Sequence, residues 1–404
     1  MEAMGRAARD AADALRTAPA EQRSQAILAM ARHVRARAKD ILAANAEDVA
    51  TATAMIDRLL LNEERLEAIA AALEQVAALP DPVGQEIARW QRPNGLDISR
   101  VRTPIGVIGM IYESRPNVTA DAAAICLRSG NAIILRSGSE ALRSALAIHG
   151  ALAEGLKEAR LPEAAIQLVP TADRDAVGMM LEGLGGAIDL IIPRGGKALV
   201  ERVSKEARVP VLGHLEGVCH TYVHRSADAE MAAEVVRNAK LRRTSVCGST
   251  ETLLIDRSVS AALLPRIAET LGDCDLRGDE EARAIVPMAP ASEADWHTEY
   301  LAPILAVKTV DGIDDAIAHI ARYGTGHTEA IIAEDSTAAE YFLDRVDSAI
   351  VIWNASTQFA DGGEFGFGAE IGIATGRLHA RGPVGPEQLT TFRYQVRGSG
   401  QIRP

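Results

Sequence analysis

The feature that most constrains this chain is an alternation of short apolar runs with longer amphipathic ones from residue 105 onward. Four apolar runs lie at residues 106–111, 131–135, 166–169 and 187–192, and helical patterns separate them. Short apolar strands that alternate with helices are typical of βαβ units, which build a parallel sheet. The sequence therefore predicts an α/β fold.

The segment before this alternation reads as helices. Apolar residues recur at three- and four-residue spacing over residues 6–16, over 20–54 in one or two segments, and over 63–79, before Pro80 and Pro82 end the pattern. Asn94-Gly95 then lies between two alternating segments, at residues 90–102, and predicts a hairpin whose type I′ turn has positive φ at both central residues. An oligomerisation arm and a plain surface hairpin both fit this pattern.

Composition and charge exclude several classes of function. The chain has 404 residues and a formal net charge of −12, which argues against a nucleic-acid partner because phosphate backbones require a basic face. Its four cysteines are far apart and include no CxxC pair, so we expect a reducing compartment. The start lacks a signal-peptide layout, and no uncharged apolar run approaches the roughly 18 residues of a membrane span. The expected location is the cytoplasm.

Cys247 is the candidate nucleophile. It lies in a polar loop between an amphipathic helix at residues 229–240 and an apolar run at 250–255. Lys240, Arg242 and Arg243 come shortly before it, and neighbouring cations favour the thiolate over the thiol. An inert, half-buried cysteine beside a solvated basic patch is the alternative interpretation.

Polar loops follow three of the predicted strands. The carboxyl ends of parallel strands, next to helix N-termini, are where α/β sheets bind anionic cofactors. The glycines in these loops form neither GxGxxG nor a Walker motif, and the Gly195-Gly196 turn also fits a tight turn without a ligand. The loop residues are Ser114, Arg115 and Asn117, then Arg136, Ser137, Gly138 and Ser139, and finally Pro193, Arg194, Gly195 and Gly196.

The remaining chain predicts a second α/β block. Residues 209–220 carry His214, Glu216, Cys219 and His220, but their spacing fits no standard zinc pattern, so no metal is expected. The later pattern indicates helices at 260–271 and 314–320, strands near 284–286 and at 349–353, and a glycine-rich stretch at 359–376.

Five motifs, taken together, are specific. They span residues 104–119, 129–141, 192–196, 213–220 and 325–329, and through them the chain resembles the γ-glutamyl phosphate reductases, a family of the aldehyde dehydrogenase superfamily. The resemblance implies a Rossmann-type cofactor domain (residues 1–90 and 105–240) and an α/β catalytic domain (241–375). It also implies an oligomerisation arm with a C-terminal segment (91–104 and 376–404).

The resemblance implies a reaction as well. In this family NADPH reduces L-glutamyl 5-phosphate to L-glutamate 5-semialdehyde and phosphate, the second step of L-proline biosynthesis. A cysteine thioester is the intermediate, and Cys247 is then the nucleophile. The expected partners are further copies of the chain, as a dimer or tetramer, and glutamate 5-kinase.

Residue roles follow from the same resemblance. Ser114, Arg115, Asn117, Lys240, Arg243 and His327 are expected at the oxyanion and the substrate, and Glu299 joins the strand-end residues at the cofactor. Arg136 replaces the usual ribose-binding lysine and favours NADPH, because an arginine can bind the 2′-phosphate. Around the cysteine, relatives read Arg-Pro-Gly-Val-Cys-Asn-Ala, whereas this chain reads Arg243-Thr-Ser-Val-Cys247-Gly-Ser.

One position bears on hydrolysis. The general-base glutamate of hydrolytic aldehyde dehydrogenases aligns with His214, which would spare a thioester from water, although Glu216 is only two residues away. Two other functions stay open: an ordinary NAD(P)-dependent aldehyde dehydrogenase, and a binding or scaffold protein with an idle Cys247.

Overall fold

The chain folds into two compact units. The structure, a computed structural model, describes residues 1–53, 56–367 and 370–403. The first unit comprises residues 1–213 with 366–372 and 384–404, and the second comprises 214–365 with 373–383. The second unit thus begins at His214 rather than at residue 241, because strand β7 (Cys219–Val223) pairs with β8 (Thr250–Asp256) and β12 (Thr328–Ile332).

The first unit begins with the expected helices. The predicted segment at 20–54 breaks at Arg37, where ψ is 17° and the helical path is interrupted between two helices. The second helix of the chain packs against the fifth helix and against the helix at residues 142–158, so other helices cover its apolar side. The helices are α1 (Glu2–Thr17), α2 (Ala20–Ala36), α3 (Ala38–Thr51), α4 (Ile56–Leu59) and α5 (Glu63–Ala78).

A four-stranded parallel sheet forms the centre of this unit, which confirms the predicted βαβ pattern. Its strand order is β5-β4-β3-β6, and β3 in its interior is buried along its whole length. Those strands are β3 (Val107–Tyr112), β4 (Ala132–Arg136), β5 (Ile166–Leu168) and β6 (Leu190–Arg194). The intervening helices are α6 (Asn117–Arg128), η1 (Ser139–Ala141), α7 (Leu142–Glu158), η2 (Glu163–Ala165), α8 (Asp175–Leu181) and α9 (Lys197–Glu206).

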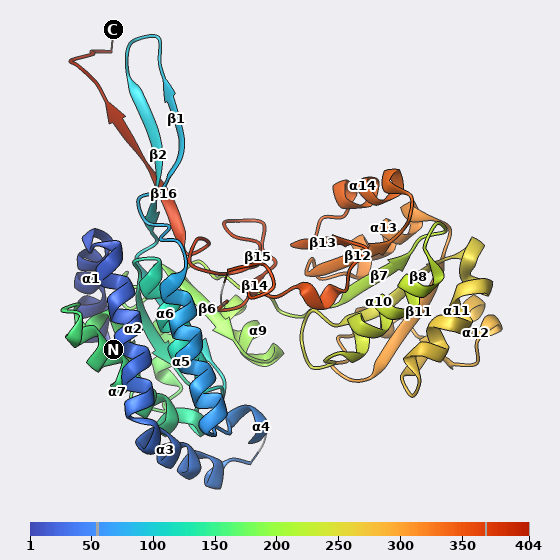
Figure 1. The fold of residues 1–404 in the computed structure, drawn as a ribbon, viewed down its shortest axis with the longest axis horizontal. Coiled ribbons are helices and arrows are strands. Elements are labelled where there is room, and N and C mark those ends of the chain that lie inside the picture. Colours follow the sequence, from blue (N-terminus) through green and yellow to red (C-terminus); the bar gives the residue numbers. More distant parts are fainter. Residues whose placement is uncertain (54–55, 368–369, 404) are drawn as a thin grey trace. The chain divides into compact units, whose positions relative to one another are not determined.

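The predicted hairpin is confirmed and gains a third strand. β1 (Glu86–Gln91) and β2 (Asp97–Pro104) are joined by β16 (Thr390–Arg397), which pairs antiparallel with β2. Figure 1 shows the three strands extending from the rest of this unit, and we call them the arm. The type I′ prediction is wrong. The Gly95 N–H donates to the Arg92 carbonyl at 2.9 Å, so Pro93 and Asn94 are the central residues of the turn, and Pro93 cannot adopt positive φ. Of the loop residues only Gly95 has positive φ.

The second unit is built on a seven-stranded sheet in which all neighbours are parallel. Its order is β10-β9-β11-β8-β7-β12-β13. The strand predicted near 284–286 is wrong, because the Asp279 carboxylate caps a helix there by accepting the Ala282 N–H. The other strands are β9 (Asp275–Gly278), β10 (Ala289–Pro290), β11 (Ile304–Val310) and β13 (Ile350–Trp353), with a small pair β14 (Ile373–Ala374) and β15 (Gly382–Pro383). The helices are α10 (Ala229–Leu241), α11 (Arg257–Leu271), α12 (Glu280–Ile285), η3 (Asp295–His297), α13 (Ile313–Tyr323), α14 (Ser336–Arg345) and η4 (Thr357–Phe359).

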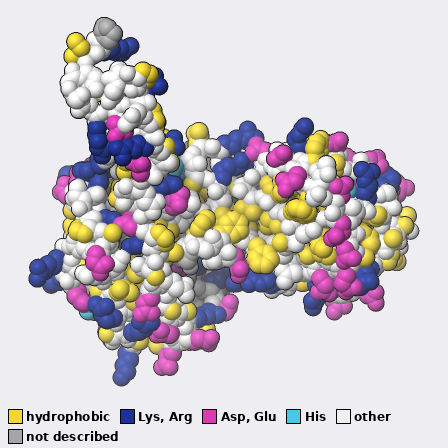
Figure 2. Space-filling model, turned by 45° about the horizontal axis from the view of Figure 1, so that its top comes forward, with side chains coloured by type: hydrophobic (Ala, Val, Ile, Leu, Met, Phe, Trp, Pro, Cys, Tyr) yellow, Lys and Arg dark blue, Asp and Glu magenta, His cyan; other side chains and the backbone are white. Residues whose placement is uncertain are grey.

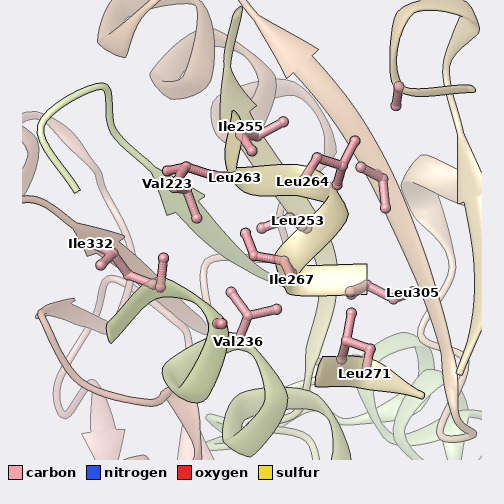
Figure 3. Packing of buried hydrophobic residues seen from close by; sticks show 14 of the residues in the cluster. Val223, Val236, Leu253, Ile255, Leu263, Leu264, Ile267, Leu271, Leu305 and Ile332 are labelled. Carbon is pink, nitrogen blue, oxygen red and sulfur yellow. The ribbon is translucent and has the colours of Figure 1, made fainter. Parts of the chain in front are cut away.

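Side-chain alternation along β8 explains why helices cover both faces of this sheet. Leu253 and Ile255 point into one apolar cluster with α10 and α11, shown in Figure 3, whereas Leu254 joins a second cluster with α13 and α14. Successive side chains of a strand face opposite sides, so a run of consecutive apolar residues needs a cover on each. Helices therefore cover both faces of the sheet.

On the face drawn in Figure 2, acidic and basic side chains are interspersed over the surface, and Lys and Arg gather along the arm. Within the described ranges, no helix combines the length and the apolar character that crossing a membrane requires.

Candidate active site

Cys247 lies at the amino-terminal edge of the second sheet together with two histidines. His214, Cys247 and His327 lie five, three and one residues before the first residues of β7, β8 and β12, and these strands are adjacent in the order β8-β7-β12. Parallel strands begin at the same edge, so residues just before adjacent strands come together although they are far apart in sequence. One ligating atom from each of the three side chains lies within 4.8 Å of the others. We call this group the Cys-His cluster.

Each histidine of the Cys-His cluster is oriented by a bond at Nδ1. His214 Nδ1 donates to the Ile373 carbonyl at 2.7 Å, which leaves Nε2 as the acceptor of the neutral ring. His327 is fully buried, its Nδ1 lies 2.9 Å from the Thr328 hydroxyl, and its Nε2 has no hydrogen-bond partner. The rings contact edge to face, with centroids 4.9 Å apart.

A second cysteine, Cys219, fixes the backbone of Cys247. The Cys219 thiol donates to the Cys247 carbonyl at 3.1 Å. Burial raises the pKa of Cys219 well above its usual value, so this sulfur stays protonated and serves as a donor. Cys247 itself is half-buried beside Ile350, Ala360 and Ile373, so it combines a fixed backbone with partial access.

The loop before β7 passes very close to Cys247. A Cβ on Gly217 would lie 2.1 Å from the Cys247 carbonyl oxygen, so only glycine fits there. The Gly217 N–H donates to the Glu299 carboxylate at 3.0 Å, and the Val218 N–H donates to the Thr325 hydroxyl at 3.0 Å. Glu299, expected at a cofactor ribose, thus lies beside the cysteine loop and helps to position it.

Of the residues expected at the substrate, Lys240 is buried away from the loop, whereas Arg243 is exposed in it. Lys240 is fully buried and forms an ion pair with the equally buried Glu251, so it is not a free positive charge, and the prediction of a substrate clamp fails. Its helix α10 turns this side chain toward β8 rather than toward the loop. Arg243 is exposed in the loop before Cys247, and its carbonyl accepts a hydrogen bond from Gln358.

A separate cavity of about 400 Å³ opens in the first unit, at the carboxyl ends of β3 and β4. Four of the strand-end residues predicted from the sequence line it: Ser114, Arg136, Gly138 and Ser139. Ser137 is buried beneath them. The loops that the sequence singled out therefore surround one cavity, of a size that suits a small-molecule or cofactor fragment.

Three arginines converge on this cavity, and the sequence named only one of them. Arg174 and Arg202 line it together with Arg136. Burial, and then the like charges of these two cations, lower the pKa of Arg136 below its usual value. Arg174 and Arg202 belong to α8 and α9 regions without a recognisable motif, so only the fold brings them to the site.

The Gly195-Gly196 turn lies at the amino end of α9, after Pro193 and Arg194 end β6. A carboxylate occupies it: the Gly196 N–H donates to Glu113 at 2.8 Å, and a Cβ on Gly195 would meet the Glu113 side chain at 2.6 Å. The turn thus presents its amide to an anion, here supplied by the protein itself.

The predicted oxyanion loop belongs to the first unit, whereas Cys247 belongs to the second. Ser114 donates to Glu140 at 3.3 Å, and Asn117 donates to Asp121 at 2.9 Å from an exposed position at the start of α6. Arg115 is half-buried in the same loop. Ser114 and Asn117 are held by local partners, and the expected contact of the three side chains with the substrate stays a prediction.

The fold and the Cys-His cluster define a class of protein. The model of the aldehyde dehydrogenase family matches residues 1–301 and 284–370. An acetylating aldehyde dehydrogenase from Geobacillus thermoglucosidasius has a similar fold, with 18% identity, a TM-score of 0.71, and coverage of 100% of this chain and 97% of that one. The chain belongs to the aldehyde dehydrogenase family.

Within that family, one group matches over the whole length. The γ-glutamyl phosphate reductase of Caulobacter sp. (strain K31) is 65% identical over 413 residues, which cover 100% of this chain and 99% of that protein. The crystal structure of γ-glutamyl phosphate reductase from Thermotoga maritima matches with 45% identity and a TM-score of 0.96, covering 100% of this chain and 99% of that one. This chain is a member of the γ-glutamyl phosphate reductases.

Proposed function

We propose that the protein reduces L-glutamyl 5-phosphate to L-glutamate 5-semialdehyde and phosphate with NADPH, an EC class 1.2.1 reaction and the second step of L-proline biosynthesis. The observation that carries the proposal is the half-buried Cys247 between two oriented histidines, in a chain that is 65% identical to such a reductase over its full length. The proposal places the enzyme in the cytoplasm.

Cys247 acts as the nucleophile. His214 lies in the Cys-His cluster, and because its Nδ1 proton is bound to the Ile373 carbonyl, its Nε2 is the nitrogen left to take the thiol proton. The thiolate attacks the acyl carbon, the C–O bond to phosphate breaks, and phosphate leaves. The resulting thioester is an easier hydride acceptor than the acyl phosphate. Bound NADPH supplies that hydride.

The negative charge that develops on the acyl oxygen needs hydrogen-bond donors to stabilise it. We assign the Cys247 N–H and a donor from the loop that holds Ser114, Arg115 and Asn117, as its sequence position implies. His327 belongs to the Cys-His cluster and is assigned as a further donor: when the Thr328 hydroxyl donates to its Nδ1, Nε2 carries the proton. Arg243 and Arg194 are assigned to the anionic ends of the substrate.

The thioester must survive until hydride arrives. A carboxylate near the sulfur would activate water against it, as in hydrolytic relatives. In the alignment that the family resemblance implies, His214 stands where those relatives have the carboxylate, and it lies in the Cys-His cluster. We infer that His214 takes the cysteine proton and, as an imidazolium, cannot then deprotonate water, so that acyl transfer in the reverse reaction goes to phosphate rather than to water.

NADPH rather than NADH fits the cavity in the first unit. The 2′-phosphate adds about two negative charges. Three arginines (Arg136, Arg174 and Arg202) line the cavity against two glutamates (Glu113 and Glu140), so the lining carries a net positive charge and offers guanidinium groups to the phosphate. Ser139 and Gly138 lie on that cavity too, where a hydroxyl and an exposed backbone can approach a phosphate. The glycine turn before α9 serves the other half of the cofactor, with Glu113 displaced.

The arm is assigned to self-association. Phe392, Tyr394 and Val396 alternate along β16, so they share one face, and 46%, 56% and 55% of their respective surfaces are exposed. A row of exposed apolar residues on a protruding sheet marks an interaction site. We propose that a second copy of the chain covers it, giving a dimer or tetramer. An association with glutamate 5-kinase stays a prediction from the family.

A reverse-direction assay tests the function. The purified protein is given glutamate 5-semialdehyde and NADP⁺, with and without phosphate, and NADPH absorbance is followed. We expect sustained reduction only with phosphate, or with arsenate in its place. Sustained turnover without either anion would identify an ordinary aldehyde dehydrogenase, and no turnover with any combination would favour a binding protein.

A further inference from the structure

The Cys-His cluster has the donor set of a metal site. Two imidazole nitrogens and one thiolate are ligands of a borderline-soft cation such as Zn²⁺, whereas Mg²⁺ and Ca²⁺ prefer oxygen. Three protein ligands with an open fourth position are the pattern of accessible zinc sites. Because the three ligands come from three separate segments, spacing along the sequence could not reveal this.

The ligating atoms are close to the distances that zinc needs. They lie within 4.8 Å of one another. Around a tetrahedral ion with ordinary bond lengths they would be about 3.3–3.6 Å apart. Cys247 is half-buried and lies in a turn, so a small rotation of its side chain can close the remaining distance.

The rings are also prepared for ligation. A metal-bound histidine usually donates its other N–H to a carbonyl or another fixed acceptor, and this fixes the tautomer. His214 already does so with the Ile373 carbonyl at 2.7 Å. His327 presents a buried Nε2 that has no hydrogen-bond partner, and the Thr328 hydroxyl can accept its Nδ1 proton. A buried ring nitrogen without a hydrogen-bond partner is unusual in a folded protein, and a metal ion would provide the partner.

We propose that the Cys-His cluster binds one Zn²⁺ through His214, Cys247 and His327, and that bound Zn²⁺ reversibly blocks the nucleophile. Binding forms two Zn–N bonds and one Zn–S bond, and the thiol proton passes to solvent. The sulfur lone pair is then engaged, so acyl transfer stops, while the thiolate is also shielded from alkylation. The binding itself does not depend on the substrate, although the inhibition rests on the proposed function.

Co²⁺ is the spectroscopic probe for this site. The metal-free full-length chain is titrated with Co²⁺ while absorbance is recorded. We expect a thiolate charge-transfer band in the near ultraviolet and strong visible bands of tetrahedral cobalt, saturating at one ion per chain. Cys247→Ser should lose the ultraviolet band, and His214→Ala, which removes a direct ligand, should weaken binding by at least the roughly 10- to 100-fold that the loss of an outer-shell partner costs. Cys274→Ser, which removes a buried thiol elsewhere in this unit, is the matched control and should leave the spectrum unchanged.

Zn²⁺ gives the second readout. We expect it to protect Cys247 from iodoacetamide and to stop turnover, with chelator restoring both. If His327→Ala fails to fold because that ring is buried, His214→Ala at the half-buried position carries the test. A cobalt band that persists in Cys247→Ser, or unchanged affinity in His214→Ala, would refute the site. A cobalt band in a protein without reductase activity would instead refute the function and leave the metal site standing.

Discussion

At the scale of single residues, neighbouring groups of the same unit fix the surroundings of Cys247. Cys219 donates to the Cys247 carbonyl, and the Ile373 carbonyl fixes the His214 ring. The sequence predicted Cys247 from its polar loop and cationic neighbours and His327 from a family motif, but it assigned Lys240 to the substrate because charge alone was visible. Whether a lysine faces a loop or the sheet depends on its position around α10, and this side chain is buried against Glu251.

The Lys240–Glu251 pair should matter for stability rather than for substrate binding. Lys240→Met leaves a buried carboxylate without its partner and should lower the free energy of unfolding by about 3–5 kcal/mol. The double variant Lys240→Met/Glu251→Leu should recover most of this loss. Urea unfolding measures both, and Arg243→Met in the exposed loop is the control. An equally stable Lys240→Met variant with a raised substrate KM would return Lys240 to the substrate site.

The same pair predicts a pH dependence. Burial raises the pKa of Glu251 from 4.5 to about 7, although Lys240 opposes the shift. The folded state therefore binds this proton more tightly than the unfolded chain, so the contribution of Glu251 to stability is full below about pH 4.5 and is lost as pH rises through about 7. In Lys240→Met the destabilisation should accordingly be smaller at pH 5 than at pH 8, by the same unfolding measurement.

The arginines of the first unit should decide cofactor choice. Arg136→Ser removes one charged donor from the proposed 2′-phosphate site, and a hydrogen bond to a charged group contributes about 1.5–3 kcal/mol. We expect kcat/KM for NADPH to fall by roughly 10- to 100-fold. The same variant assayed with NADH is the control and should change little. Equal losses with both cofactors would mean that Arg136 supports the fold or a shared part of the cofactor.

At the scale of elements, the close approach of the loop before β7 to the loop before β8 is the tightest constraint on the site. Gly217→Ala would push a methyl group into the Cys247 carbonyl, so we expect a displaced cysteine and a large fall in kcat with the fold retained. Activity and circular dichroism measure the two effects. Gly376→Ala, in the same unit with open space around it, is the control. Unchanged kcat in Gly217→Ala would show that Cys247 tolerates movement.

The elements also show how far sequence patterns reach. Apolar strands such as β3 and β8 were predicted because continuous apolar runs are visible, whereas β7 and β12 were missed. These two strands are fully buried yet carry His220 and Glu329, whose side chains pair with each other at 2.9 Å. From sequence alone a polar residue is predicted to be exposed unless its buried partner is known, and here that partner lies on another strand. The unit boundary and the Cys-His cluster depend on those strands.

At the scale of the whole molecule, assembly should depend on one face of the arm. Tyr394→Glu with Val396→Glu places two like charges in the apolar row of β16, and burying them against a second copy is costly. We expect the protein to shift to monomers in light scattering coupled to size exclusion. Arg393→Glu introduces the same residue on the opposite face of the strand and is the matched control. An unchanged mass in the double variant would assign self-association to another surface.

The most direct measurement of the central proposal is the acyl group on Cys247 itself. The protein is mixed with glutamate 5-semialdehyde and NADP⁺ without phosphate, quenched in acid, digested and mapped by mass spectrometry. We predict a glutamyl thioester on the peptide that contains Cys247, lost when phosphate is added before the quench. Reduction of NADP⁺ with Cys247 left unmodified, or with the acyl group on another cysteine, would contradict the account.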